Sequence, residues 1–240
     1  MIIFPAIDLI QGQAVRLFKG QYDQMTVYDP SPLHVAEQFK LCGAEAVHLV
    51  DLEGARDGTM PNREVVAAIK KQTGLFCEVG GGIRSMEAAS WYIEHGLDRV
   101  ILGTSALTDP DFVCRCLDQF PGKVAIGADA RDGFISVKGW TEDSTTPIED
   151  FILKLKNLGC DTFIVTNISR DGAMQGTNLA LYRDLSRRFG LRFTASGGVS
   201  SMEDVIRLRD MGLYAAIIGK AYYTGAISLR EAVAAAEGTA

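Results

Sequence analysis

The chain has 240 residues, of which 47% are hydrophobic, and its formal net charge is −6. This length and apolar content allow a sizeable core, and we expect residues 1–240 to form a single domain. The negative charge excludes a large basic surface of the kind that binds nucleic acid. No apolar run approaches the roughly 20 residues of a membrane span, so we also expect no membrane partner.

The cysteines and the N-terminus indicate the compartment. The five cysteines form no C-x-x-C pair, and the segment MIIFPAIDL lacks the basic start of a signal peptide. We therefore expect reduced thiols and a cytoplasmic protein. Cys114 and Cys116 have no Cys or His partner nearby in the sequence, so we expect no metal site.

Short apolar segments alternate with helical patterns along the chain. Eight segments read as strands, apolar without strict alternation, as parallel strands covered on their faces are: 2–7, 46–50, 76–79, 99–102, 124–128, 162–165, 192–195 and 215–218. The helical patterns between and after them cover 32–42, 62–72, 86–95, 110–120, 147–158, 179–188, 202–211 and 229–236. Eight βα units in about 240 residues predict a (β/α)8 TIM barrel, with a doubly wound open sheet as the alternative.

Two connections are longer than a barrel needs. Residues 12–20 (GQAVRLFKG) predict a small hairpin that leads into a mobile loop as far as Pro32. Residues 130–140 (ARDGFISVKGW) contain an Asp132-Gly133 turn between β-like arms. Both follow the carboxyl ends of strands, where barrels bind their ligands, so we expect both loops to contact a substrate.

An internal repeat is the most informative feature of the sequence. Residues 81–108 recur without a gap as residues 197–224, and each copy reads as strand end, glycine turn, helix, strand and glycine turn. Such a repeat favours two duplicated half-barrels over an open sheet. Glycine turns after a strand, followed by a helix N-terminus, can bind phosphate through backbone N–H groups. Two copies therefore predict a small-molecule substrate with two phosphates.

The repeat and the first loop supply the candidate substrate-binding residues. Pairing of two glycine turns within each half is a stronger signal than either turn alone. The candidates are Arg16, Gly81, Gly82, Arg84, Gly103, Thr104, Gly197, Gly198, Gly219 and Lys220.

Polar residues that end the strands supply the candidate catalytic groups. Asp8 and Asp129 end the first and fifth strands, at equivalent places in the two halves, and can act as general base and general acid on one substrate. Thr166 ends the sixth strand and could orient a reacting group. Asp171 follows in the next loop as a third carboxylate, although an Asp-Gly pair is more often only a turn.

Other side chains give weaker signals. Histidines 34, 48 and 95 combine with no cysteine or carboxylate at ligand spacing, so histidine chemistry is poorly supported. No G-x-G-x-x-G precedes an acidic residue, so nothing indicates a dinucleotide cofactor. Trp140 in the fifth loop could stack on a heterocycle or anchor its own loop onto the barrel.

The whole chain resembles one enzyme family, the histidine-biosynthesis isomerase that converts N-(5-phosphoribosyl)formimino-5-aminoimidazole-4-carboxamide ribotide (ProFAR) to its ribulosyl form (PRFAR). The matching segments are PAIDLIQGQAVRL, HLVDLEGARDG, VGGGIRSME, VILGTSAL, GADARDG with KGW, IVTNISRDGAMQGTN, ASGGVSSMED and IIGKAYY. Their combination is specific, although no single segment is.

The resemblance implies roles for individual residues. It implies Asp8 as base, Asp129 as acid and Thr166 as an assisting group, with the glycine turns holding two phosphates. It also implies an Amadori rearrangement, which changes no oxidation state overall and needs no cofactor. The family often has an acidic residue where this chain has Asn167, a departure that leaves Asp171 as a rival acid.

Three other functions compete with this one. The cyclase subunit of imidazole glycerol phosphate synthase, which works with a glutaminase partner, shares the half-barrel repeat. It typically carries Lys, Cys and Asn where this chain has Arg16, Ala6 and Gly103. A bifunctional barrel that also isomerises phosphoribosylanthranilate fits SGGVSSMED, whereas KGQYDQMTVYDP resembles the single-function enzyme. The third is a sugar-phosphate binding barrel without catalysis. For this chain we expect a monomer.

Overall fold

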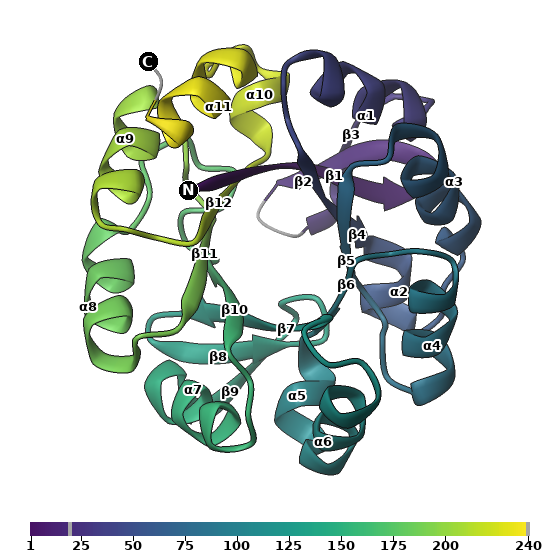
Figure 1. The fold of residues 1–240 in the computed structure, drawn as a ribbon, viewed down its shortest axis with the longest axis vertical. Coiled ribbons are helices and arrows are strands. Elements are labelled where there is room, and N and C mark those ends of the chain that lie inside the picture. Colours follow the sequence, from purple (N-terminus) through teal and green to yellow (C-terminus); the bar gives the residue numbers. More distant parts are fainter. Residues whose placement is uncertain (19–20, 239–240) are drawn as a thin grey trace.

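The computed structural model describes residues 1–18 and 21–238 and shows a closed parallel barrel ringed by helices (Figure 1). The barrel strands are β1 (Ile2–Ile10), β4 (Ala46–Asp51), β5 (Phe76–Gly80), β6 (Arg99–Leu102), β7 (Val124–Arg131), β10 (Thr162–Asn167), β11 (Arg192–Ser196) and β12 (Ala215–Ile218). Consecutive barrel strands pair in parallel, β12 pairs with β1, and β7 pairs with β10. The predicted TIM barrel is confirmed, and each predicted strand lies within its observed counterpart.

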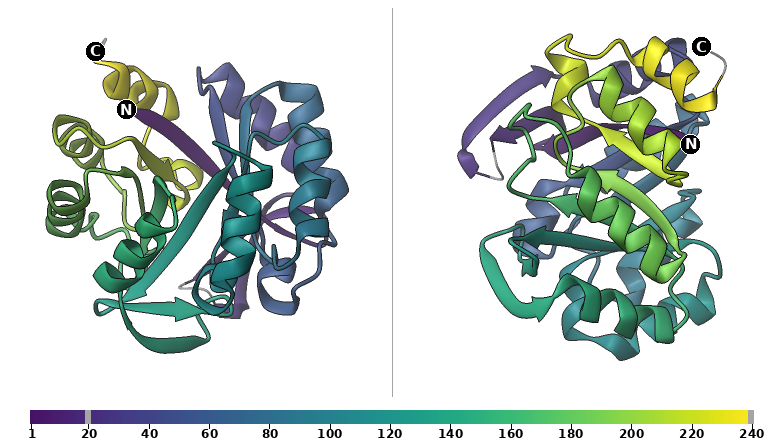
Figure 2. Two further views of the ribbon diagram at one scale, coloured as in Figure 1. Left: turned by 60° about the horizontal axis from the view of Figure 1, so that its bottom comes forward. Right: turned by 90° about the vertical axis from the view of Figure 1, so that its left-hand side faces the viewer.

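Within the described residues, eight longer helices cover the outside of the barrel (Figure 2). They are α1 (Pro32–Leu41), α3 (Arg63–Thr73), α4 (Met86–Glu94), α6 (Pro110–Gln119), α7 (Ile148–Asn157), α8 (Leu179–Phe189), α9 (Met202–Asp210) and α11 (Leu229–Glu237). The starts of α4 and α9 follow from capping chemistry, because Ser85 accepts from the N–H of Ala88 and Ser201 forms a capping box with Asp204. No helix of the described residues is long and apolar enough to cross a bilayer.

Three short helices were not predicted: α2 (Leu52–Asp57), α5 (Thr104–Thr108) and α10 (Lys220–Tyr223). Each is at most six residues long, too short to show a helical period in the sequence. All three follow the carboxyl ends of barrel strands, and α5 and α10 lie at equivalent places in the two halves of the repeat. They therefore contribute to the end of the barrel where the candidate residues lie.

Two antiparallel hairpins extend the sheet at the same end. β2 (Gln13–Phe18) pairs with β1 and with β3 (Gln21–Asp29), whereas β8 (Phe134–Val137) pairs with β7 and with β9 (Glu142–Pro147). The prediction of a mobile loop before Pro32 was wrong for 21–29, because cross-strand pairing orders this segment as β3. Lys19 and Gly20, at the end of the predicted hairpin segment, lie outside the described residues.

Apolar side chains fill two separate spaces. The larger cluster joins the inner faces of the helices to the outward-facing strand residues and includes Phe39, Phe112 and Tyr182. A smaller cluster, built from alternate strand positions, occupies the barrel interior: Phe4, Ala6, Ala46, Ile101, Ala125, Ile164, Ala215 and Ile217. The second cluster fills the barrel below its carboxyl end, so the barrel is a packed support and not a channel.

The glycine turns of the repeat have a packing reason as well as a possible binding role. Gly81 has φ +100, and a Cβ there would lie 2.1 Å from the carbonyl oxygen of Asp51. Its counterpart Gly197 has φ +84, and a Cβ there would lie 2.6 Å from the carbonyl oxygen of Asn167. Both turns thus pack against the end of the preceding barrel strand, where only glycine fits.

Gly81→Ala should lower the free energy of unfolding by about 2–5 kcal/mol, because both the left-handed backbone and the contact with Asp51 oppose a side chain. Gly74→Ala is the control, since Gly74 also has positive φ but no atom lies within 4 Å of an added Cβ. It should cost only about 1–2 kcal/mol. Urea unfolding measures both variants, and equal losses would contradict the packing argument.

Candidate active site

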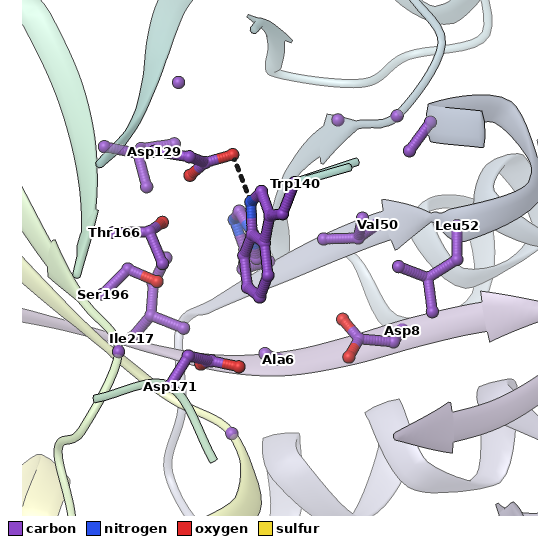
Figure 3. A pocket seen from close by; sticks show the side chains of 18 of the residues that line it. Ala6, Asp8, Val50, Leu52, Asp129, Trp140, Thr166, Asp171, Ser196 and Ile217 are labelled. Atoms are coloured by element: carbon purple, nitrogen blue, oxygen red, sulfur yellow. Dashed lines mark hydrogen bonds between the residues drawn. The ribbon is translucent and has the colours of Figure 1, made fainter. Parts of the chain in front are cut away.

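A pocket opens at the carboxyl end of the barrel, and every barrel strand contributes to it (Figure 3). The strands provide, in ring order, Asp8, Val50, Gly80, Ile101, Asp129, Thr166, Ser196 and Ile217. Polar groups lie toward the mouth, while the apolar interior cluster lies beneath. Such a concave site with a few convergent polar groups is the expected form of a small-molecule pocket.

This one pocket brings together all the candidate residues of the sequence. They are Asp8, Arg16, Gly81, Gly82, Arg84, Gly103, Thr104, Asp129, Trp140, Thr166, Asp171, Gly197, Gly198, Gly219 and Lys220. They come from both halves of the repeat and from both hairpin regions. Residues that are far apart in the sequence therefore share one ligand-sized space.

Arg16 joins two of the three carboxylates. From β2, its guanidinium donates to Asp8 Oδ2 at 2.8 Å and to both carboxylate oxygens of Asp171, at 2.7 and 2.8 Å. Both carboxylates are buried. Burial raises the pKa of the Asp8 carboxyl, and the adjacent Arg16 opposes this rise because it favours the charged form.

Asp129 has a different environment. It accepts hydrogen bonds from the Trp140 Nε1–H at 2.8 Å and from the hydroxyl of Thr166, its neighbour across the β7–β10 pairing. Burial raises the pKa of the Asp129 carboxyl, and these two hydrogen bonds oppose the rise. Neither donor carries a charge, so Asp129 lacks the directly bound cation that Asp8 has. We therefore expect Asp129 to retain its proton to a higher pH than Asp8.

Trp140 points into the pocket and not away from it (Figure 3). Its backbone has φ +70, in the left-handed region that a bulky residue rarely adopts, and the flanking Lys138 and Gly139 also have positive φ. The N–H of Lys138 donates to Thr104 Oγ1 at 2.9 Å, which docks this loop next to α5. The loop conformation thus places the indole beside Asp129.

The two halves place similar helix N-termini at the pocket. Gly103 precedes α5 with φ −99° and ψ −101°, and Gly219 precedes α10 with φ −104° and ψ −105°. The first N–H groups of a helix have no partner within the helix and attract anions. Arg16 packs closely over Gly219, and Lys220 donates to the carbonyl oxygen of Gly172 at 2.8 Å.

The sequence reasoning missed several pocket residues, above all His48. His48 lies on β4 two residues before Val50, so strand alternation turns it to the same inner side. That alternation was the signal in the sequence that could have placed His48 in the pocket, whereas metal-ligand spacing could not. Ser196 and Tyr22 also line the pocket. Among the described residues, no group of three or more His, Cys, Asp or Glu side chains is placed to hold a metal ion.

The arrangement supports general acid–base chemistry. Two carboxyl groups with different neighbours lie in one pocket, and such pairs can hold different protonation states at one pH. Two sets of glycine turns and helix N-termini flank them. The pocket can therefore bind an elongated anionic molecule and move protons near its middle.

Comparison with known proteins agrees with this chemistry. The family described as histidine biosynthesis protein matches residues 2–228. A protein of Lactococcus lactis subsp. cremoris is 46% identical over 96% of this chain and 95% of its own length. One from Ruegeria pomeroyi is 46% identical over 99% and 100%, and one from Ruminiclostridium cellulolyticum is 41% identical over 98% and 100%.

The first and third of these relatives are named 1-(5-phosphoribosyl)-5-((5-phosphoribosylamino)methylideneamino)imidazole-4-carboxamide isomerase, and the Ruegeria protein is named isomerase 1 of that type. The matches cover nearly the whole chain, including both halves of the repeat. This chain therefore belongs to the histidine biosynthesis protein family.

Proposed function

We propose that this chain isomerises ProFAR to PRFAR. The observation that carries the proposal is the placement of Asp8 and Asp129 in one pocket between two equivalent glycine-turn sites. The relatives are named for a substrate with two phosphoribosyl groups, which fits two phosphate sites. None of the three is named as a cyclase or as a phosphoribosylanthranilate isomerase, so the alternatives lack support.

The proposed mechanism divides acid and base work between the two carboxyl groups. Protonated Asp129 gives its proton to the furanose ring oxygen while the bond from that oxygen to C1′ breaks, and the nitrogen lone pair forms a Schiff base. Ionised Asp8 then removes the proton from C2′, and the C–H electron pair forms the C1′–C2′ double bond as the iminium is neutralised. Tautomerisation of this enolamine, in which C1′ gains a proton as the C2′ hydroxyl loses one, gives the ketose.

The phosphates supply binding energy away from the reacting carbons. We assign one phosphate to Gly81, Gly82, Gly103 and Thr104 with Arg84 nearby. We assign the other phosphate to Gly197, Gly198, Gly219 and Lys220. Holding both ends fixes the ribose between the two carboxyl groups, which lowers the entropic cost of reaching the transition state.

Asp171 is the rival for the acid role, and one observation favours it. Arg16 donates to both Asp8 and Asp171, so Asp171 lies at the pocket beside the same guanidinium as the proposed base. Against it, both carboxylate oxygens of Asp171 already accept hydrogen bonds from the Arg16 guanidinium, whereas Asp129 is bound only by uncharged donors. Asp129 is the better acid on this ground.

The compartment, the oligomeric state and the partners of the chain are also proposed here. We propose a cytoplasmic monomer that forms one barrel domain and acts on a small bisphosphate without nucleic acid. The pocket is complete within a single chain, the five cysteines are free thiols and the net charge is −6. Sedimentation of the purified protein checks the monomer.

The purified chain alone should convert ProFAR to the ribulosyl product, with no cofactor, metal or glutaminase added. Chromatographic separation of the two compounds measures the conversion. Failure to convert, with folded protein and intact substrate, would contradict the isomerase assignment.

Asp8→Asn and Asp129→Asn should each lower kcat/KM by about 100-fold or more, since each removes a proton-transfer group. Asp132→Asn is the matched control, because Asp132 follows the end of β7, close to Asp129 in sequence, is exposed, and does not line the pocket. It should stay within about twofold of the wild type.

The pH profile separates the two possible acids. Activity should fall at low pH as Asp8 gains a proton and at high pH as Asp129 loses one, and Asp129→Asn should remove the high-pH fall. If Asp171→Asn removes that fall and Asp129→Asn leaves it in place, the acid role belongs to Asp171.

Asp129→Asn should also make the protein more stable than the wild type at pH 8. The folded-state pKa of Asp129 is raised by burial, so the folded wild type binds this proton more tightly than the unfolded chain does. The wild type therefore loses stability relative to the variant as pH rises above about 3.9. Thermal unfolding from pH 3.5 to 8 measures the gap, and a gap that does not change with pH would contradict this.

A further inference from the structure

Three polar side chains form a buried row beneath the pocket. His48, Glu78 and Arg99 occupy paired positions on the neighbouring strands β4, β5 and β6. His48 Nδ1 lies 2.8 Å from Glu78 Oε1, and Arg99 donates to Glu78 Oε2 at 3.1 Å. Glu78 is 0% exposed and Arg99 is 3% exposed, whereas His48 lines the pocket.

The row determines which nitrogen of His48 carries a proton. Arginine is always charged and only donates, so Arg99 holds Glu78 as a carboxylate. A carboxylate only accepts, so His48 Nδ1 must be the donor in their 2.8 Å contact. A neutral His48 then carries its lone pair on Nε2, the nitrogen left for groups in the pocket.

Stability alone is a poor explanation for these charges. Removing two charges from water costs about as much as their attraction returns, so a buried ion pair is weak support for a fold. Arg99 does gain a hydrogen bond to the Tyr214 hydroxyl at 3.0 Å and lies 5.0 Å from the Phe76 ring centre. The row nevertheless ends at the pocket.

We propose that Glu78, held by Arg99, is a positioning residue that fixes His48 with its proton on Nδ1 and its Nε2 lone pair facing the pocket. There, Nε2 accepts a hydrogen bond from a hydroxyl of the sugar substrate. The role in turnover rests on the proposed isomerase function, whereas the protonation of His48 does not.

Glu78→Gln should reverse this arrangement. The guanidinium of Arg99 takes the only acceptor of the Gln side chain, its carbonyl oxygen, and the amide NH₂ then faces His48 Nδ1. The proton of His48 should move to Nε2. ¹⁵N NMR of labelled histidine reads the two tautomers directly in the substrate-free protein, and turnover of ProFAR should fall roughly 10- to 100-fold, as when the outer partner of a metal-bound histidine is lost.

The double variant Glu78→Gln/Arg99→Met should restore both properties. Without the guanidinium, the Gln carbonyl can turn to His48 and again accept from Nδ1–H, and no unpaired charge is left buried. Asp98→Asn is the matched control. Asp98 binds Lys70 and the Cys77 N–H at 2.7 Å, next to Arg99 in sequence but away from His48. In the Asp98→Asn variant, the tautomer of His48 should not change, and turnover should stay within about twofold of the wild type.

The outcomes are distinguishable. A wild-type His48 with its proton on Nε2 overturns the proposal, even if neither variant folds. So does a loss of turnover in Glu78→Gln without a tautomer change, or a folded double variant that regains the tautomer but not the turnover. A wild-type protein that never isomerises ProFAR defeats the proposed function and leaves the tautomer result standing.

Discussion

The guanidinium of Arg16 lies between two buried carboxylates, and the chemistry of the pocket depends on this placement. A buried carboxylate without a cation would gain a proton, because the low-dielectric surroundings penalise its charge. Arg16 opposes this rise in pKa at Asp8, while Asp129 receives only neutral hydrogen bonds. One fold thus places two aspartates with different neighbours at equivalent strand ends, and an acid and a base on one substrate require such a difference.

The internal repeat explains why the scaffold is symmetric while the chemistry is not. Gly103 and Gly219 share nearly the same backbone angles, and Gly81 and Gly197 make the same close approach to a preceding strand end. These positions are set by the backbone, so duplication preserves them. Side chains are free to diverge, and Asp8 and Asp129 have acquired different partners in Arg16 and Trp140. Two equal ends for binding and two unequal groups for proton transfer suit an elongated bisphosphate.

The barrel and the pocket residues could be predicted from the sequence, because both depend on short-range patterns. Apolar runs and glycine stops mark the strands and helices, and residues that end parallel strands must meet at one end of the barrel. It could not reveal β3 or β9, since pairing and not composition orders those segments. His48 and its link to Glu78 were missed because they are distant in sequence and meet only through strand register. The contacts of Arg16 with Asp171 depend on loop geometry that no local pattern encodes.

The order in which Asp8 and Asp129 lose their protons tests the account most directly. Carboxyl-carbon NMR of ¹³C-labelled aspartate, recorded across pH on the substrate-free protein, gives this order once each signal is assigned by its absence in the matching Asn variant. We expect the signal of Asp129 to titrate at the higher pH. The opposite order, with Asp129 ionised while Asp8 still holds its proton, would contradict it.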